Sequence, residues 1–191
     1  MPRIVDHDKR KREIARSALM LFSKQGYHES SFSDIASACR LSRSNIYNYF
    51  KNKDEIFHYA VVELLNSITQ NIELIAHQDS LTLAQKLQRI YQLFTNDFGD
   101  GKNASIILYL SLRLKRKDTK LVATLDNSAV NLRKNIENLF VSENANLPYV
   151  QIAVVTTLFF SLIESSITHS LFTEKAFIQQ NIAVILQMLG I

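Results

Sequence analysis

Chain-breaking residues are scarce in this sequence, which contains four glycines and two prolines among 191 residues. Strand-connecting turns and disordered segments are rich in these two residue types, so a strand-rich or disordered chain would contain more of both. Hydrophobic residues make up 47% of the chain, enough for a sizeable core. Through most of its length they recur every three or four positions, a spacing typical of helices. We therefore predict an all-α protein.

A first helix is predicted over residues 8–24. Its apolar side chains form one stripe, which comprises Ile14, Ala15, Ala18, Leu21 and Phe22. Gly26 follows, and glycine suits the positive φ that is common after a helix C-terminus. Tyr27 is then able to fold back onto the stripe. The helix is expected to end at this glycine.

Two short helices joined by a tight turn are predicted next. Ser33 is expected to cap the first, of about two turns, and Ser42 the second, over residues 43–50. Ile46 and Phe50 share one face of the second helix and are expected to point inward. Basic and amide side chains are left on its outer side. The pair is predicted to be a helix-turn-helix, a motif whose second helix enters the major groove of DNA.

A longer helix is predicted to join this head to a helical body. Asn52 and Glu55 have the spacing of a capping box, and the apolar pattern behind them continues to Ile75. The body is expected to contain further helices over residues 83–98, 104–114, 121–140, 148–172 and 176–189. We place the head at residues 1–58 and the body at residues 59–191.

The excess of basic charge lies in the head. Residues 1–60 contain 11 basic and 7 acidic side chains, whereas residues 61–191 contain 11 of each. Residues 40–53, which include the second short helix, contain four basic side chains and no acidic ones. Such asymmetry is typical of a surface that binds a polyanion, and ordinary surface solubility is the alternative.

Cysteine and histidine usage argues against a disulfide framework, a metal site or an enzyme. Cys39 is the single cysteine, and the five histidines are scattered without ligand spacing. No glycine-rich phosphate loop or nucleophile elbow is found in the sequence. We expect no cofactor, no metal and no catalytic activity. A redox-sensing Cys39 is a minor alternative, because a buried cysteine is usually inert.

A cytoplasmic location with no membrane association is expected. The first 12 residues are polar and charged, with no apolar stretch behind them of the kind that secretion requires. The most apolar stretch, residues 150–171, is interrupted by polar residues such as Gln151 and Glu164. This stretch is predicted to be a buried helix and not a membrane span.

A set of motifs over residues 12–57 carries a family resemblance: Gly26-Tyr27, Asp34-Ile35-Ala36, Leu41-Ser42, Tyr49-Phe50 and Lys53-Asp54-Glu55. In order and spacing they resemble the DNA-binding domain of TetR-type transcriptional regulators. The resemblance implies a homodimer whose two heads occupy successive major grooves of a palindromic operator, about 34 Å apart. It also implies a body that binds a small molecule which weakens DNA binding. The mostly apolar residues of the body favour a hydrophobic or amphipathic molecule over a highly charged one. Repression is the usual outcome in that family.

Three alternatives stay open at this point. An activator has the same kind of head as a repressor, and a redox-responsive regulator does too. A helical protein-interaction module is the third alternative, with the basic head serving solubility. Salt dependence separates this module from a DNA-binding protein, because basic side chains that neutralise phosphates release counterions.

The predicted DNA contacts lie mainly on the second short helix. Arg43 is expected to bind a guanine edge or a phosphate, and Asn45 and Asn48 to read adenine or reach a phosphate through water. The resemblance implies that Tyr47 and Tyr49 contact the sugar-phosphate backbone, with core packing as the alternative for one of them. The full predicted set is Ser31, Ser33, Arg40, Ser42, Arg43, Ser44, Asn45, Tyr47, Asn48, Tyr49 and Lys53.

Two other basic residues have separate expected roles. Lys53 begins the fourth predicted helix, where its ammonium and the helix N–H groups are expected to face one phosphate. Arg40 stands in the turn between the short helices, where the TetR family commonly has glycine. A non-glycine residue in a left-handed turn costs about 1 kcal/mol, and an arginine there is able to gain a phosphate contact.

In the body, aromatic residues are the candidates for an effector pocket, with ordinary core packing as the alternative: Tyr91, Phe94, Phe98, Tyr109 and Phe140. The last two predicted helices, over residues 148–172 and 176–189, are the expected dimer surface. The first of them is apolar around most of its circumference, more than one small core needs to cover, and a central core helix is the alternative. Its predicted dimer-interface residues are Val155, Leu158, Phe159, Leu162 and Ile163.

Overall fold

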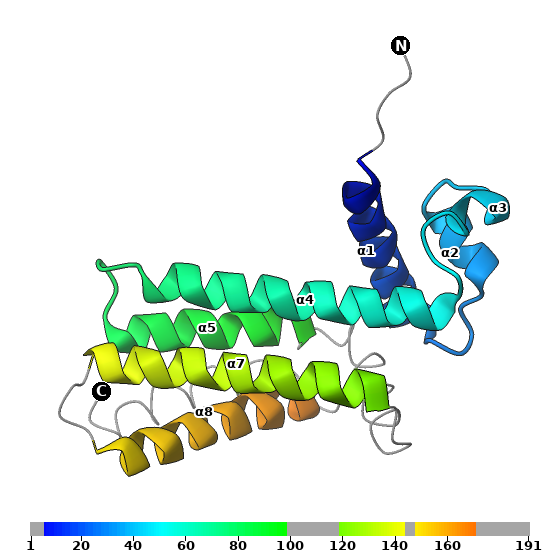
Figure 1. Ribbon diagram of the computed structural model, residues 1–191. Helices are drawn as coiled ribbons and strands as arrows, with labels where there is room; N and C mark the ends of the chain where they lie inside the picture. Colours follow the sequence, from blue (N-terminus) through cyan, green and yellow to red (C-terminus); the bar gives the residue numbers. More distant parts are fainter. Residues whose placement is uncertain (1–5, 99–118, 144–147, 171–191) are drawn as a thin grey trace. The chain divides into compact units, whose positions relative to one another are not determined.

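The computed structural model describes residues 6–98, 119–143 and 148–170. Within these ranges every regular element is a helix, so the all-α prediction is confirmed. Figure 1 shows the helices in chain order: α1 (His7–Gln25), α2 (Phe32–Ala38), α3 (Arg43–Ile46), α4 (Lys53–Ala76), α5 (Leu83–Phe98), α7 (Thr119–Glu143) and α8 (Tyr149–Ser170). The helices predicted over residues 104–114 and 176–189 lie outside the described residues.

The chain divides into two compact units. The first comprises Met1–Leu65 and Ser105–Val122, and the second Asn66–Ala104 and Ala123–Ile191. Their boundary after Leu65 lies inside α4, seven residues beyond the boundary expected after residue 58. We call the first unit the head and the second the body.

The head is held together by the stripe on α1. Ile14, Ala18 and Phe22 are at most 1% exposed. The ring of Phe22 lies 5.1 Å from that of Tyr27 and 5.8 Å from that of Phe57 on α4. Burying an aromatic or branched aliphatic side chain of this size contributes about 1.5–3 kcal/mol. The stripe therefore anchors α1 against α4 within the head.

Both ends of α1 follow from local chemistry. The Asp6 carboxylate accepts a hydrogen bond from the Lys9 N–H at 3.0 Å, which caps the N-terminus. At the C-terminus, Gly26 adopts φ 87° and its N–H donates to the Phe22 carbonyl at 2.9 Å. The predicted glycine stop is confirmed, because this φ is readily adopted by a residue without Cβ.

The cap of α2 differs from the prediction. Ser31 is the N-cap, and its hydroxyl accepts the Asp34 N–H at 3.0 Å while the Asp34 carboxylate accepts the Ser31 N–H at 2.8 Å. These reciprocal bonds form a capping box and hold the pKa of Asp34 below its ordinary value. Ser33, the predicted cap, lies inside the helix, because the residue that pairs with the acid three positions on is Ser31.

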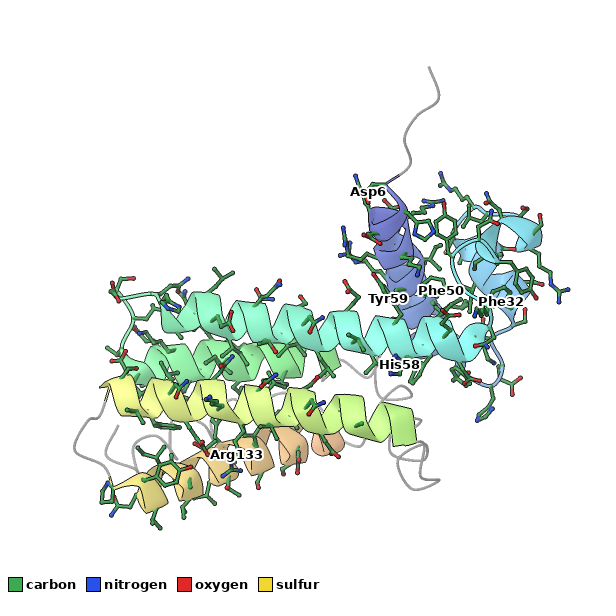
Figure 2. The ribbon with its side chains drawn as sticks, viewed as in Figure 1. Asp6, Phe32, Phe50, His58, Tyr59 and Arg133 are labelled. Atoms are coloured by element: carbon green, nitrogen blue, oxygen red, sulfur yellow. The ribbon has the colours of Figure 1, made fainter. Side chains whose placement is uncertain are left out.

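The start of α4 follows the prediction in part. The side chain of Asn52 accepts the Glu55 N–H at 2.8 Å, as a cap does. The Glu55 carboxylate accepts a bond at 2.7 Å from the N–H of Lys51, one residue before the cap. Beside this turn the Phe50 and Tyr59 rings lie 5.5 Å apart (Figure 2), with the Lys11 ammonium 5.4 Å from the Phe50 centroid.

In the body, α5, α7 and α8 pack along one another, as Figure 1 shows. The helix α5 has the predicted bounds, and Thr82 and Gln85 form a reciprocal cap before it at 3.3 and 2.9 Å. Tyr91 on α5 donates to the Ser166 hydroxyl on α8 at 2.7 Å. Leu87, Ile90 and other apolar side chains fill the space between the helices and are almost fully buried.

A buried ammonium joins three segments of the body. Lys86 on α5 is 2% exposed, and its Nζ donates to the Ala76 carbonyl at the end of α4 at 2.8 Å. The same Nζ forms an ion pair with the Glu143 carboxylate on α7 at 2.6 Å. Glu143 is less protected, since 31% of its side chain is exposed. The pair therefore depends on Glu143 to compensate the charge of Lys86.

Substitution of Glu143 should lower the free energy of unfolding more than substitution of Lys86. Glu143→Ala leaves a buried ammonium without its counter-ion and should lower the free energy of unfolding by about 3 kcal/mol. Lys86→Met replaces the ammonium by an apolar chain of similar size and leaves a carboxylate that water reaches, so about 1 kcal/mol is expected. Urea denaturation of both variants measures the difference. Equal losses would mean that the Lys86 charge is compensated by other groups.

The helix α8 is the most apolar segment that the structure describes. Its window Tyr149–Ser166 has a mean hydropathy of 1.4, enough by length and composition alone to cross a membrane, and 28% of the window is buried. The prediction that its polar residues exclude it by composition is therefore wrong. Composition alone is weak support for a span, because core helices of soluble proteins have the same property.

Candidate nucleic-acid interface

The turn between α2 and α3 is closed by backbone hydrogen bonds around Arg40. Arg40 has φ 55°, and its N–H donates to the Ser37 carbonyl at 3.0 Å. The N–H of Leu41 donates to the Ala36 carbonyl at 2.8 Å. These two bonds are those of a Schellman motif, which normally has glycine in the left-handed position. The predicted left-handed turn at Arg40 is confirmed, and the exposed side chain leaves the bonding pattern intact.

Arg40→Gly should raise the stability of the head by up to about 1 kcal/mol, because glycine adopts a left-handed φ without a Cβ clash. Thermal unfolding measures the gain. Arg40→Ala is the matched control, since it removes the same charge but keeps the Cβ and the strain. If the two variants were equally stable, the turn would not be strained.

The helix α3 is positioned by its cap and by two buried side chains. The Ser42 hydroxyl accepts the Asn45 N–H at 3.1 Å, so Ser42 is the predicted cap. Ile46 is 0% exposed and Phe50 is 1% exposed, which confirms that both point inward. The regular helix ends at Ile46, earlier than predicted, and Phe50 closes a last turn by donating its N–H to the Ile46 carbonyl at 3.1 Å.

The outer side of α3 and of the turn after it is polar and exposed. Arg43, Ser44, Asn45 and Asn48 all lie on the surface. The Asn48 amide donates to the Asn45 side-chain oxygen at 3.0 Å, and the Ser42 and Ser44 hydroxyls are 3.0 Å apart. The linked amides keep further donors and acceptors in a fixed arrangement, and an arginine beside them adds a planar fork of N–H donors. Such groups are able to bond the edges of bases.

The two tyrosines after α3 differ in environment. Tyr47 is 50% exposed, and its ring packs against Phe32 of α2 at 4.8 Å. Tyr49 is half-buried and stacks on His7 of α1 at 4.9 Å, with the ring planes 27° apart. The His7 Nε2 is also 3.4 Å from the Asn48 carbonyl oxygen. Tyr47 is therefore the more accessible of the two predicted backbone contacts.

Lys53 has a different environment from the one predicted. Its Nζ donates to the Tyr27 carbonyl at 2.7 Å and to the Ser30 carbonyl at 2.8 Å. The ammonium also lies 4.2 Å from the centroid of the Tyr27 ring. Burial lowers the pKa of Lys53, with nearby carboxylates opposing the shift. In this structure the Lys53 ammonium is bonded to the loop between α1 and α2, and its phosphate contact stays a prediction.

Sequence reasoning did not find Arg10 or His7 as supports of this surface. The Arg10 guanidinium donates to the Cys39 carbonyl at 3.1 Å, which holds the end of α2 against α1. Arg10 also pairs with Glu13 at 2.6 Å. The Arg10–Cys39 bond and the His7–Tyr49 stack depend on how α1 packs against the segments that follow it, whereas the Arg10–Glu13 pair lies within α1. In the sequence, the polar residues at the start of α1 did not indicate that His7 and Arg10 support this surface.

Cys39 is buried at the end of α2, with 9% of the residue exposed. Desolvation raises the pKa of its thiol, and a hydrogen bond with Ser17 and the charge of Arg10 oppose the shift. A raised thiol pKa leaves little thiolate, the reactive form, at neutral pH. This environment favours a packing role over redox sensing.

The body residues predicted to line an effector pocket are packed where the structure describes them. Tyr91 is 2% exposed, Phe94 8% and Phe140 0%. Burial raises the pKa of Tyr91, and its bond to Ser166 opposes the shift. Tyr109 and the side chain of Phe98 lie outside the described part. In the ranges that the structure covers, no group of three or more His, Cys, Asp or Glu residues is arranged to hold a metal ion.

The predicted dimer residues divide between two faces of α8. Val155, Phe159 and Ile163 are 9, 5 and 3% exposed and belong to the core of the body. Leu158 is 48% exposed and Leu162 is half-buried. The other exposed apolar residues of this helix, with exposures from 53 to 72%, are Tyr149, Val150 and Val154. Burial of the first three side chains removes them from any surface for a second subunit.

An open groove of about 390 Å³ follows this exposed face. Its lining includes Val150, Val154 and Leu158 of α8, with Arg133 of α7 at its side. Figure 2 labels Arg133, whose guanidinium donates to the Ala153 carbonyl at 3.0 Å and the Thr157 hydroxyl at 2.9 Å and pairs with Glu137 at 2.9 Å. We call Tyr149, Val150, Val154 and Leu158 the α8 face.

The chain is similar to known proteins in the sequence of its head and in its overall fold. Residues 14–60 match the family described as bacterial regulatory proteins, tetR family. The chain is 29% identical over 93 residues to the HTH-type transcriptional regulator PksA of Bacillus subtilis, a match that covers 49% of this chain and 45% of PksA. It is 26% identical over 102 residues to IcaR of Staphylococcus epidermidis, a negative transcriptional regulator of a biofilm operon, covering 53% and 52%. The matches thus span about half the length of these curated relatives.

A solved structure extends the likeness to most of the chain. The transcriptional regulator FadR of Bacillus subtilis, solved in complex with stearoyl-CoA, superimposes with a TM-score of 0.71. The alignment covers 93% of this chain and 96% of FadR at 19% identity. The superposition shows a shared fold, with a helix-turn-helix head and a helical body.

Proposed function

We propose that the protein is a sequence-specific transcriptional regulator, because residues 14–60 match the tetR family of bacterial regulatory proteins. It acts as a ligand-responsive repressor that binds a palindromic operator as a dimer. The observation that carries the proposal is the polar outer side of α3, where Arg43, Asn45 and Asn48 are exposed on a helix held by a buried Ile46. Relatives such as PksA and IcaR are HTH-type regulators, and IcaR is a negative one.

In this proposal α3 enters the major groove. Arg43 bonds a guanine edge, and the linked amides of Asn45 and Asn48 read an adjacent base. Tyr47, Ser42 and Ser44 lie nearby and contact the sugar-phosphate backbone, and Arg40 reaches a phosphate from the turn. The basic excess of the head supports the approach to DNA.

The dimer is proposed to form through the α8 face. Four apolar side chains exposed along one side of a helix are unfavourable in water and are suited to pairing with the same face of a second copy. Leu162, half-buried beside them, extends the surface. A two-fold dimer places two heads on half-sites about one turn of DNA apart.

The effector is proposed to be a hydrophobic or amphipathic molecule bound in the body. The interior of the body consists mostly of apolar and aromatic side chains, and a pocket that opened among them would suit such ligands better than highly charged ones. The fold neighbour FadR was solved with stearoyl-CoA, so this molecule is the first to test. Release of a labelled operator by stearoyl-CoA measures the response.

Selection of bound duplexes from a random DNA pool tests the proposal. We expect enrichment of a palindrome, and an affinity for it that falls steeply as salt rises, with a slope of about 0.9 for each phosphate neutralised. A pool without any enriched palindrome, or a flat salt dependence, would overturn the DNA-binding proposal. Reporter expression with and without the protein then gives the sign of regulation.

A further inference from the structure

His7, on the first turn of α1, contacts the turn that follows α3. Its ring stacks on the Tyr49 ring at 4.9 Å, with the ring planes 27° apart. Its Nε2 lies 3.4 Å from the Asn48 carbonyl oxygen, and a hydrogen bond there requires a proton on Nε2, because a carbonyl only accepts. All three residues belong to the head. One side chain of α1 therefore supports both the backbone of this turn and one of its side chains.

The backbone that carries His7 is itself fixed within the head. The Asp6 carbonyl accepts the Arg10 N–H at 3.0 Å, and the Asp6 side chain caps the helix. Arg10 stands about one turn after His7, and its guanidinium donates to the Cys39 carbonyl at 3.1 Å. This bond joins α1 to the end of α2, directly before the turn at Arg40. The start of α1 is thereby held beside the helix-turn-helix.

Tyr49 combines a held ring with a free hydroxyl. The residue is half-buried, and His7 covers one face of its ring. Within the described part of the chain the Tyr49 hydroxyl has no hydrogen-bond partner, and its oxygen is not sealed from solvent. The buried Tyr91 hydroxyl, by contrast, donates to Ser166. A phenolic hydroxyl is able to donate to a phosphate oxygen, and a ring that is ordered beforehand loses less freedom on binding.

We propose that His7 is a positioning residue for operator binding, which holds the Tyr49 ring so that its hydroxyl donates to a DNA phosphate. The proposal rests on the proposed DNA-binding function. His7 acts through Tyr49 and is not itself a DNA contact. Ordering one side chain on binding lowers affinity by a factor of about 2–12, and a dimer has two heads. Loss of the His7 ring should therefore weaken operator binding about 5- to 150-fold.

A double-mutant cycle on the enriched duplex tests whether His7 acts through the Tyr49 hydroxyl. His7→Ala and Tyr49→Phe should each weaken binding by at least about fivefold. The double variant should bind no more weakly than Tyr49→Phe alone, because without the hydroxyl no phosphate donor is left to position. Fluorescence anisotropy measures affinity at fixed salt, at a temperature at which circular dichroism shows every variant folded. If the two losses multiplied, His7 would act independently of that hydroxyl and the proposal would fail.

A conservative variant separates the stack from a direct contact of His7 with DNA. His7→Phe keeps an aromatic face but has no ring nitrogen, so it should restore most of the affinity that His7→Ala loses. A hydrogen bond from His7 to phosphate would be lost in both variants, and equal weakening by the two would overturn the proposal. His77→Ala is the matched control, because His77 is an exposed histidine in the body. It should bind as the native protein does.

Nuclear magnetic resonance of the free protein tests the stack without DNA. Nuclear Overhauser effects should join the ring protons of His7 and Tyr49, and His7→Ala should shift the Tyr49 ring resonances. The Tyr47 ring packs against Phe32 and should keep its resonances. Absence of these effects would overturn the stack. A native protein that selects no duplex would overturn the proposed function, whereas a selected duplex with multiplying losses would overturn the role of His7 alone.

Discussion

Replacing Arg43 with alanine is expected to weaken operator binding by about 30-fold to 10⁴-fold. A bidentate arginine–guanine pair is worth about 1–3 kcal/mol, and a dimer on a palindrome loses two such pairs. Arg43 is exposed beside the linked amides of Asn45 and Asn48, so its loss leaves the fold of the head unchanged. Fluorescence anisotropy with the enriched duplex at fixed salt measures the effect.

The same variant distinguishes the two contacts open to Arg43. If the arginine reads guanine, Arg43→Ala relaxes the preference for one base pair in each half-site and affects other sequences little. If it binds phosphate, the variant weakens all sequences alike and makes the salt slope shallower. Arg89→Ala is the matched control, since Arg89 is an exposed arginine on α5 in the body. If the Arg43→Ala protein bound the duplex as tightly as the control, α3 would not be the helix that contacts the bases.

Replacing Val154 with glutamate is expected to convert the dimer to a monomer at micromolar concentration. Val154 is 53% exposed in the middle of the α8 face, so the carboxylate is solvated in a single subunit and the body stays folded. In the proposed dimer the two-fold axis brings both introduced charges into one apolar interface, where desolvation and repulsion oppose pairing. Sedimentation in the analytical ultracentrifuge measures the oligomeric state.

Loss of the dimer should also weaken operator binding by at least about a thousandfold, because one head reads one half-site. Val130→Glu is the matched control, since Val130 is an exposed valine, at 64%, on α7. It should sediment and bind DNA as the native protein does. A Val154→Glu protein that stays dimeric would place the interface elsewhere.

Local sequence signals predicted much of the head. The turn at Arg40, the cap at Ser42 and the inward faces of Ile46 and Phe50 all lie within a few residues of the features that determine them. The bounds of α5 were also predictable, because its apolar period is strong and Thr82 and Gln85 cap its start. Helix propensity, caps and periodicity act over one or two turns, so a single sequence contains them.

The cap of α2 was predictable in principle from the spacing of its acid. Ser31 and Ser33 are both good caps by residue type, but Asp34 stands three positions after Ser31, the spacing of a capping box. Choosing the serine nearest to the apolar run gave the wrong one. The capping box decides which serine is the cap, because the side chains of Ser31 and Asp34 each accept a hydrogen bond from the backbone N–H of the other residue.

Helix α8 is an element whose buried face the apolar periodicity does not predict. Its apolar residues surround most of the helix, so their spacing does not say which side faces the core. Packing against α5 and α7 places Val155, Phe159 and Ile163 inside and leaves Val150, Val154 and Leu158 outside. The predicted interface therefore included three residues that are unavailable to a partner.

The sequence by itself determined that this chain is helical, that a short exposed helix follows a left-handed turn, and that basic charge accompanies it. These properties depend on neighbours in the chain. Tertiary structure decided which polar groups face outward. Lys53 lies 23 residues from Ser30, and burial of its ammonium against loop carbonyls occurs only once α4 packs beside that loop. The acceptors within reach of this basic side chain are brought to it by the fold, and a linear pattern does not contain them.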